Sequence, residues 1–195
     1  MGFLSKTASD IVNSSSGGAY FSPSKLQDGG SIRFALLSDK PLEFWECWGT
    51  GPDGKARPFR FAVPDAPTYE DILAEMGDFT PREGRGGPGT AEMKFCTAVP
   101  IWSYEAGAVQ VMSITQKSII REIDVISQSE DYADLTAWDF TLSKKGAGLN
   151  TEYKLRPAPR KKGSDAVIAE AWDEAKDAGF DLSRLLTGGN PFKAE

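Results

Sequence analysis

Aromatic and cationic side chains alternate along several short segments of this chain, a combination suited to holding a single nucleic acid strand. An aromatic ring stacks on a base, and a nearby lysine or arginine neutralises a phosphate. The candidate contact residues are Trp45, Trp48, Arg57, Phe59, Arg60, Arg82, Arg85, Lys94, Trp102, Tyr104, Lys117, Lys144, Lys145, Tyr153, Lys154 and Arg156. Because aromatic residues also build the cores of small β domains, each of these rings has a purely structural alternative.

Strand alternation sorts the aromatic candidates into two faces. In the segment that begins at Lys94, the residues Phe95, Val99 and Ile101 share one apolar face. Trp102 falls on the other face together with Lys94, because successive strand residues point to opposite sides. Trp102 is therefore expected to be exposed and to be a better stacking residue than Phe95.

Trp45 and Trp48 raise the same question in the segment 43–49. If this segment is a regular strand, side chains three residues apart point to opposite faces. Both tryptophans cannot then face the core, so one of them is expected to be exposed.

The composition argues against an enzyme. The chain has no histidine, which excludes Ser-His-Asp and Cys-His catalysis and histidine-ligated zinc. Cys47 and Cys96 lie far apart in apolar, strand-like segments and are expected to be buried thiols. The acidic residues Glu130, Asp131 and Asp134 have no spacing that specifies a metal or acid–base site. No catalytic residue, cofactor or metal is predicted.

Residues 80–90 form a glycine-rich loop containing Gly84, Gly86, Gly87 and Gly89. The loop lacks the Gly-Lys-Ser/Thr ending and the strand–loop–helix context of a phosphate-binding P-loop. It is interpreted as a flexible basic flap that closes over a bound strand with Arg82 and Arg85. An idle surface loop is the alternative.

Charge is distributed unevenly along the chain. The formal net charge is −6, which taken alone disfavours binding to phosphates. Residues 140–162, however, hold seven bases and one acid, whereas residues 163–195 hold seven acids and three bases. A basic segment is thus followed by an acidic tail, and the distribution matters more than the sum.

The hydrophobic periodicity predicts a mainly β domain with inserted helices, closest to a small, partly open antiparallel barrel. The expected strands are 31–37, 43–49, 58–63, 93–104, 109–114, 138–142 and 151–156, and the expected helices are 68–76, 116–127 and one that begins at Ser164. Three regions are expected: a flexible arm over 1–30, the barrel over 31–159, and a basic linker with an acidic tail over 160–195.

An ordered series of segments resembles the phage single-stranded DNA-binding proteins of the OB-fold type. It comprises residues 99–117, the isoleucine-rich helix, Trp138-Asp139-Phe140-Thr141-Leu142 and the turn over 146–153, and the likeness covers roughly 31–160. The resemblance implies a five-stranded OB-fold barrel that coats and protects single-stranded DNA, without catalysis, during phage DNA replication, recombination and repair. It implies the cytoplasm of the infected bacterial host. Unlike the zinc-containing branch, this chain lacks histidine and has too few cysteines for zinc.

The C-terminal region is similar to the acidic tails of bacterial single-stranded DNA-binding proteins, which end in a Pro-Phe pair. Here Pro191 and Phe192 follow acidic residues, but three residues before the terminus. The likeness implies that the tail recruits replication and recombination proteins through Asp181, Leu185, Leu186, Pro191 and Phe192. An anionic tail can also compete for a basic groove until DNA arrives. The alternative is a helix that packs on the barrel through Ile168 and Trp172.

A second function class stays open at this point. The same barrel could serve a phage structural or interaction protein that binds protein, and self-association is compatible with either class. No membrane partner is expected, because no stretch of about 18 apolar residues occurs.

Overall fold

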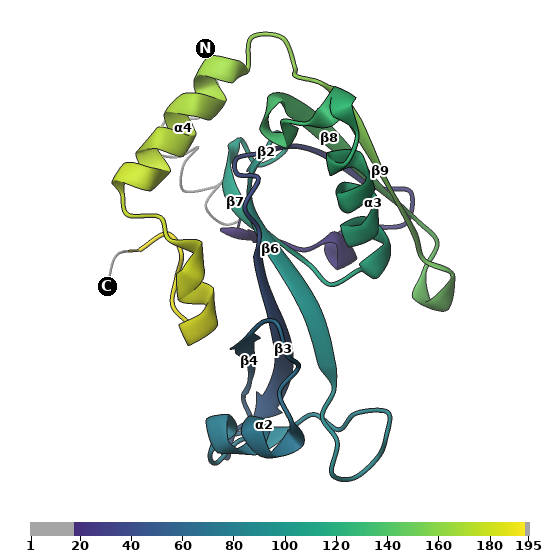
Figure 1. Cartoon of the computed structure of the whole chain (residues 1–195), viewed down its shortest axis with the longest axis vertical. Coiled ribbons are helices and arrows are strands. Elements are labelled where there is room, and N and C mark those ends of the chain that lie inside the picture. Colours follow the sequence, from purple (N-terminus) through teal and green to yellow (C-terminus); the bar gives the residue numbers. More distant parts are fainter. Residues whose placement is uncertain (1–17, 194–195) are drawn as a thin grey trace, which may run out of the picture. The chain divides into compact units, whose positions relative to one another are not determined.

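The computed structural model describes residues 18–193 and is mainly β, with a mixed sheet and a few helices, which confirms the predicted fold class at this level (Figure 1). Expectations for residues 1–17 lie outside the described residues. The chain divides into two compact units. Unit 1 contains residues up to 41 and 99–178, and unit 2 contains 42–98 and those from 179 on.

The sheet of unit 1 has strand order β1-β7-β6-β2-β8-β9. The strands are β1 (Tyr20–Phe21), β2 (Ser31–Leu36), β6 (Met93–Ser103), β7 (Ala108–Ile114), β8 (Trp138–Lys145) and β9 (Glu152–Pro159). β2 pairs antiparallel with β6 and β8, and β8 pairs antiparallel with β9, whereas β1 joins β7 in parallel. The strands expected over 93–104 and 109–114 form the neighbours β6 and β7, and those expected over 138–142 and 151–156 form the pair β8 and β9.

One face of this sheet, here called the inner face, holds the main core. Phe34 of β2 stacks on Phe140 of β8, with ring centroids 5.8 Å apart, and both side chains are buried. Helix α3 (Lys117–Ser127) adds Ile119, which is fully buried, and contacts both β7 and β9. The predicted isoleucine stripe therefore packs on the inner face.

Helix α3 also protects an edge of the sheet. β9 ends the strand order, so its outward backbone groups have no neighbouring strand. The Glu122 carboxylate accepts a hydrogen bond from the backbone N–H of Leu155 at 2.8 Å. A helix side chain thus satisfies a donor that a further strand would otherwise take.

The outer face of the same sheet carries helix α4 (Asp165–Asp177). Ile168 is buried against Ala35, Leu37 and Trp102, and Trp172 packs beside them. The sequence left two alternatives for this region, an acidic tail and a helix packed through Ile168 and Trp172, and the structure shows the packed helix.

The described part of the expected N-terminal arm is also packed. It contributes β1 and the short helix η1 (Pro23–Lys25), and Phe21 and Leu26 lie against the inner core. Gln110 donates a hydrogen bond from Nε2 to the carbonyl oxygen of Gly18 at 2.6 Å. Short segments such as β1, at two residues, give too little periodicity to be found from sequence.

Unit 2 is built on β3 (Leu42–Thr50), which pairs with β4 (Ala56–Ala62), β5 (Thr80–Pro81) and the first part of β6. Helix α2 (Tyr69–Met76) covers one face and buries Ile72 and Met76. Thr68 begins the helix with a reciprocal capping box to Asp71, as the spacing of these residues favours. Gly49 lets α2 pack closely on β3, because a Cβ at this position would come within 2.9 Å of the Met76 sulfur.

The C-terminal segment belongs to unit 2 and forms η5 (Leu182–Thr187), whose Leu185 is buried against β3 and β4. The remaining short helices are η2 (Glu130–Tyr132), η3 (Leu135–Ala137) and η4 (Gly148–Asn150). Residues 160–195 were expected to be a linker and a tail, but the described part of this region is folded in both units.

Candidate nucleic-acid interface

The predicted contact residues divide between the two units. Unit 1 holds Trp102, Tyr104, Lys117, Lys144, Lys145, Tyr153, Lys154 and Arg156, and unit 2 holds Trp45, Trp48, Arg57, Phe59, Arg60, Arg82, Arg85 and Lys94. Each group is therefore described within its own unit.

In unit 1, the outer face of β2, β8 and β9 brings cations together. The register aligns Arg33, Thr141 and Arg156 in one row across the three strands. The next row is Ser31, Ser143 and Lys154, and Lys145 lies opposite Glu152 beyond it. Arg33, Lys145, Lys154 and Arg156 are called the basic sheet face below.

Asp139 anchors one end of the basic sheet face. Its carboxylate is fully buried and accepts hydrogen bonds from Arg33 at 2.8 Å, the Tyr104 hydroxyl at 3.0 Å and the Lys161 backbone N–H at 3.0 Å. A buried carboxylate is tolerated only when it is paired and hydrogen-bonded in this way. These contacts hold β2, β8 and the segment before α4 in fixed positions.

Tyr104 is the aromatic side chain beside this anchor. Its half-buried ring has the Arg33 guanidinium 5.6 Å and the Lys161 ammonium 5.5 Å from its centroid. The hydroxyl contacts Asp139 and also Ser164, at 2.9 Å. The ring is therefore held in one orientation at the end of the basic sheet face, between two cations.

Arg160 was expected to be part of a basic linker but is mostly buried. Its side chain is 14% exposed, lies 3.3 Å from the Asp139 carboxylate and donates to the carbonyl oxygen of Thr136. Lys161 and Lys162 are exposed. The two lysines, and not Arg160, can reach an external phosphate.

The expectation that Trp102 is exposed is wrong. Trp102 is 8% exposed and lies beneath α4, against Leu37 and Ile168. Alternation placed it on the opposite face from Val99 and Ile101, which pack in the inner core. That outer face is covered by a helix from a distant part of the sequence, which a period-2 pattern does not reveal.

Lys144 and Tyr153 lie opposite each other on β8 and β9, and both side chains make contacts within unit 1. The Lys144 ammonium donates to the carbonyl oxygens of Leu26 at 2.7 Å and Ser24 at 3.3 Å. Tyr153 packs against the inner core, and this burial raises the pKa of its phenol. Of the β8–β9 candidates, Lys145, Lys154 and Arg156 are exposed. Lys117 is exposed at the start of α3.

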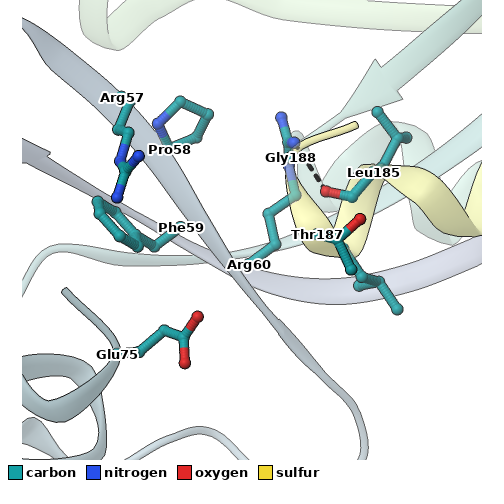
Figure 2. Close-up of a pocket in the computed structure, with 9 residues that line it drawn as sticks. Arg57, Pro58, Phe59, Arg60, Glu75, Leu185, Thr187 and Gly188 are labelled. Atoms are coloured by element: carbon teal, nitrogen blue, oxygen red, sulfur yellow. Dashed lines mark hydrogen bonds between the residues drawn. The ribbon is translucent and has the colours of Figure 1, made fainter. Parts of the chain in front are cut away.

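In unit 2, Arg57, Phe59 and Arg60 line a pocket of about 310 Å³ with Glu75 and the η5 segment, as Figure 2 shows. The Arg57 guanidinium lies on the ring of Phe59, 4.6 Å from its centroid. Arg60 pairs with Glu46 at 3.0 Å and donates to the carbonyl oxygen of Leu185 at 2.9 Å. The charge of Arg60 is therefore compensated inside unit 2, and Phe59 is buried.

Trp45 and Trp48 are both half-buried, so neither is the exposed ring that was expected. Trp45 packs edge-on against Phe95, with centroids 5.4 Å apart, and its indole N–H is buried without a hydrogen-bond partner. The indole N–H of Trp48 donates to Glu46 at 3.1 Å. Alternation was correct in placing them on different faces, but both faces of β3 are covered, by α2 and η5.

The remaining cations of unit 2 surround one carboxylate. Glu92 lies 3.1 Å from the Lys94 ammonium and 3.4 Å from Arg82. The hydrogen bond from Lys94, reinforced by Arg82, lowers the pKa of Glu92. Arg85 is exposed in the glycine-rich loop. Two of these three cations thus already face an acid.

The residues predicted to bind partner proteins are packed into unit 2. Leu185 and Pro191 are buried, and Leu186 and Phe192 are half-buried. Asp181 caps η5 by accepting a hydrogen bond from the Ser183 N–H at 2.9 Å, and the hydrogen bonds from Ser183 lower its pKa. A partner would reach Leu185 or Pro191 only after this segment had left its place.

The two cysteines are free and buried, as predicted. Burial raises the pKa of Cys47 to about 11 and that of Cys96 to about 12. Among residues 18–193, no cluster of cysteine or acidic side chains is arranged to hold a metal ion. No helix in the same range is long and apolar enough to cross a membrane.

Comparison of the chain with protein-family models, curated proteins and solved structures yields no match.

Proposed function

We propose that this protein binds single-stranded DNA without catalysis, mainly through the basic sheet face of unit 1. On this proposal, the strands of unit 1 with α3 represent a partly open OB-fold barrel. The protein then coats and protects displaced strands during phage DNA replication, recombination and repair, in the cytoplasm of the infected bacterial host.

The observation that carries the proposal is a set of exposed cations on the adjacent strands β8 and β9, of which only Lys145 has an acid, Glu152, opposite it. On the outer face of the described β2, β8 and β9 residues, the acids are Asp139 and Glu152. Asp139 is buried and already paired with Arg33, so it offsets little of the charge that a ligand meets. Lys145, Lys154 and Arg156 are left exposed beside small polar side chains, a surface that a phosphate backbone can approach closely.

Phosphate contacts are expected to contribute more to the affinity than base stacking. Tyr104 is the aromatic residue next to the basic sheet face, and its hydroxyl is fixed by Asp139. Trp102, in contrast, is buried. Binding dominated by phosphate neutralisation is only weakly selective for sequence and strongly dependent on salt.

The C-terminal segment is proposed to recruit replication or recombination proteins through Asp181, Leu185, Leu186, Pro191 and Phe192. Because Leu185 and Pro191 are buried, recruitment requires the segment to leave β3 and β4 first. The energy of that release would be part of the cost of binding a partner.

Salt titration of binding to a fluorescent oligothymidine tests the proposed interface. For single strands, each phosphate contact contributes about 0.7 to the slope of log affinity against log salt. The double variant Lys154→Ala/Arg156→Ala should therefore lower that slope by about 1.4. Arg121→Ala is the matched control, because Arg121 is exposed on α3 in the same unit and off the basic sheet face.

A wild-type protein with no salt-dependent affinity for the oligonucleotide would overturn the proposal and favour the protein-binding alternative. An equal loss in the double variant and in Arg121→Ala would place the contact elsewhere. The tested cations are exposed, so neither variant is expected to change folding by more than about 0.5 kcal/mol.

A further inference from the structure

The tip of the β8–β9 hairpin presents an apolar side chain that is fully exposed among the described residues of unit 1. Leu149 lies in η4 and is 103% exposed, whereas the exposed valines Val125 and Val167 keep part of their surface covered, at 62% and 51%. In Figure 1 this tip is the green turn that joins β8 to β9. Turn positions normally carry polar residues, and a single exposed leucine is not informative by its exposure alone. Leu149 is distinguished by the fixed turn that holds it and by the charges beside it.

The tip is braced and does not resemble a loose loop. Gly146 has φ +82°, and a Cβ there would collide with the carbonyl oxygen of Asn150. Its N–H donates to the Asp28 carboxylate at 2.7 Å, and the Thr151 hydroxyl donates to the carbonyl oxygen of Gly148 at 2.8 Å. Leu149 is therefore held outward by a fixed turn, which lowers the entropic cost of using it in binding.

The charges around the tip indicate what chemistry the partner has. Lys145 and Lys154 of the basic sheet face are exposed on the strands that lead to the turn, and one acid, Glu152, is exposed opposite Lys145. An apolar tip beside cations suits a ligand with flat apolar groups attached to phosphates. Leucine side chains inserted between bases are a known way to unstack nucleic acid.

We propose that Leu149 inserts between neighbouring bases of the strand bound on the basic sheet face. This inference rests on the proposed function and defines its substrate class: flexible single strands, whose neighbouring bases can be unstacked to admit a side chain. The lysines hold the phosphates on either side while the leucine replaces the contact that the separated bases lose.

An oligothymidine with a single central 2-aminopurine, flanked by adenines, tests the insertion. The emission of 2-aminopurine is quenched by stacking, so the wild-type protein should raise it on binding. Leu149→Ala should bind about tenfold more weakly, the factor expected when most of one leucine's burial is lost. Its salt slope should be unchanged, because the phosphate contacts remain. Val125→Ala, at an exposed position of helix α3 in the same unit, should match the wild type in affinity and emission.

Because Leu149 is fully exposed, Leu149→Ala should unfold at the same denaturant concentration as the wild type. If Leu149→Ala retains the affinity and the emission rise of the wild type, the insertion is wrong and strand binding stands. A variant that loses affinity but keeps the emission rise also contradicts insertion. If the wild type shows no salt-dependent binding, the proposed function itself fails, and insertion fails with it.

Discussion

Asp139 is the residue on which three parts of unit 1 converge. It lies in β8, pairs with Arg33 of β2 and Arg160 beyond β9, and accepts the Tyr104 hydroxyl. A buried carboxylate contributes little stability over an apolar core, but removing its charge leaves its partners uncompensated. Its main effect is to fix where Arg33 and Tyr104 lie, and so to shape one end of the basic sheet face.

Asp139→Asn should therefore destabilise unit 1 and disturb the interface together. The expected loss is about 2 kcal/mol, below the 3–5 kcal/mol typical of fully buried pairs, because the Arg33 side chain is 38% exposed and water screens it. Urea unfolding followed by circular dichroism measures the loss. Asp124→Asn, an exposed acid on α3, should change the midpoint very little, and equal losses in the two variants would contradict the role of Asp139.

Residue patterns alone predicted some of these features and missed others. The wide separation of Cys47 and Cys96 and their apolar, strand-like segments predicted two buried thiols, which the structure confirms. The exposure of a side chain was harder to predict, because it depends on which other element covers that face of the sheet. Trp102 was placed on the correct side of β6 but is covered by Ile168, which is more than sixty positions further along the chain.

At the scale of elements, local periodicity was sufficient to predict the longer strands and helices. The strands over 31–36 and 108–114 and helices α2 and α3 lie within two residues of their predicted bounds. Each has its own repeating apolar pattern, and α2 has a capping box at Thr68. The two strands that were missed, β1 and β5, have two residues each and exist only because a neighbouring strand is available.

Helix α4 shows how an acidic segment becomes part of a fold. Its exposed side is charged, but Ile168 and Trp172 lie with Trp102 and Leu37 on the outer face of unit 1. The net charge of the region suggested a tail, whereas its apolar stripe indicated packing. Because burial of a few apolar side chains is worth several kcal/mol, the stripe determines the outcome.

Ile168→Ala should destabilise the attachment of α4 by about 2–4 kcal/mol, since Ile168 is 7% exposed and its removal leaves a cavity beside Trp102. The change should be visible as a red shift of tryptophan emission at lower denaturant than in the wild type. Val167→Ala is the matched control, because the neighbouring Val167 is 51% exposed. A Val167 variant that is equally destabilised would argue that helix propensity, and not packing, holds α4.

At the scale of the whole molecule, the sequence predicted one barrel with appendages, and the structure has two compact units. The second unit consists of residues 42–98 completed by the C-terminal segment, so its parts lie far apart in sequence. Long-range pairing of this kind leaves no local signal, because the side chains of η5 have neither strand nor helix periodicity. The resemblance over 31–160 implied a single fold and gave no reason to divide it.

The division predicts that the C-terminal segment stabilises unit 2 and leaves unit 1 unaffected. Leu185 is 3% exposed against β3 and β4, and its carbonyl oxygen accepts a hydrogen bond from Arg60. Leu185→Ala should cost unit 2 about 2–4 kcal/mol, because the side chain is fully packed. Leu186→Ala, at a half-buried neighbour, should cost less than about 1 kcal/mol.

Hydrogen exchange distinguishes the two units in one experiment. In Leu185→Ala, the amides of β3 and β4 should exchange faster by roughly two orders of magnitude, the factor that corresponds to about 3 kcal/mol. The amides of β8 and β9, in unit 1, should keep the protection they have in the wild type. Uniform acceleration across β3, β4, β8 and β9 would mean that the two units open together, and that the C-terminal segment stabilises the whole chain and not unit 2 alone.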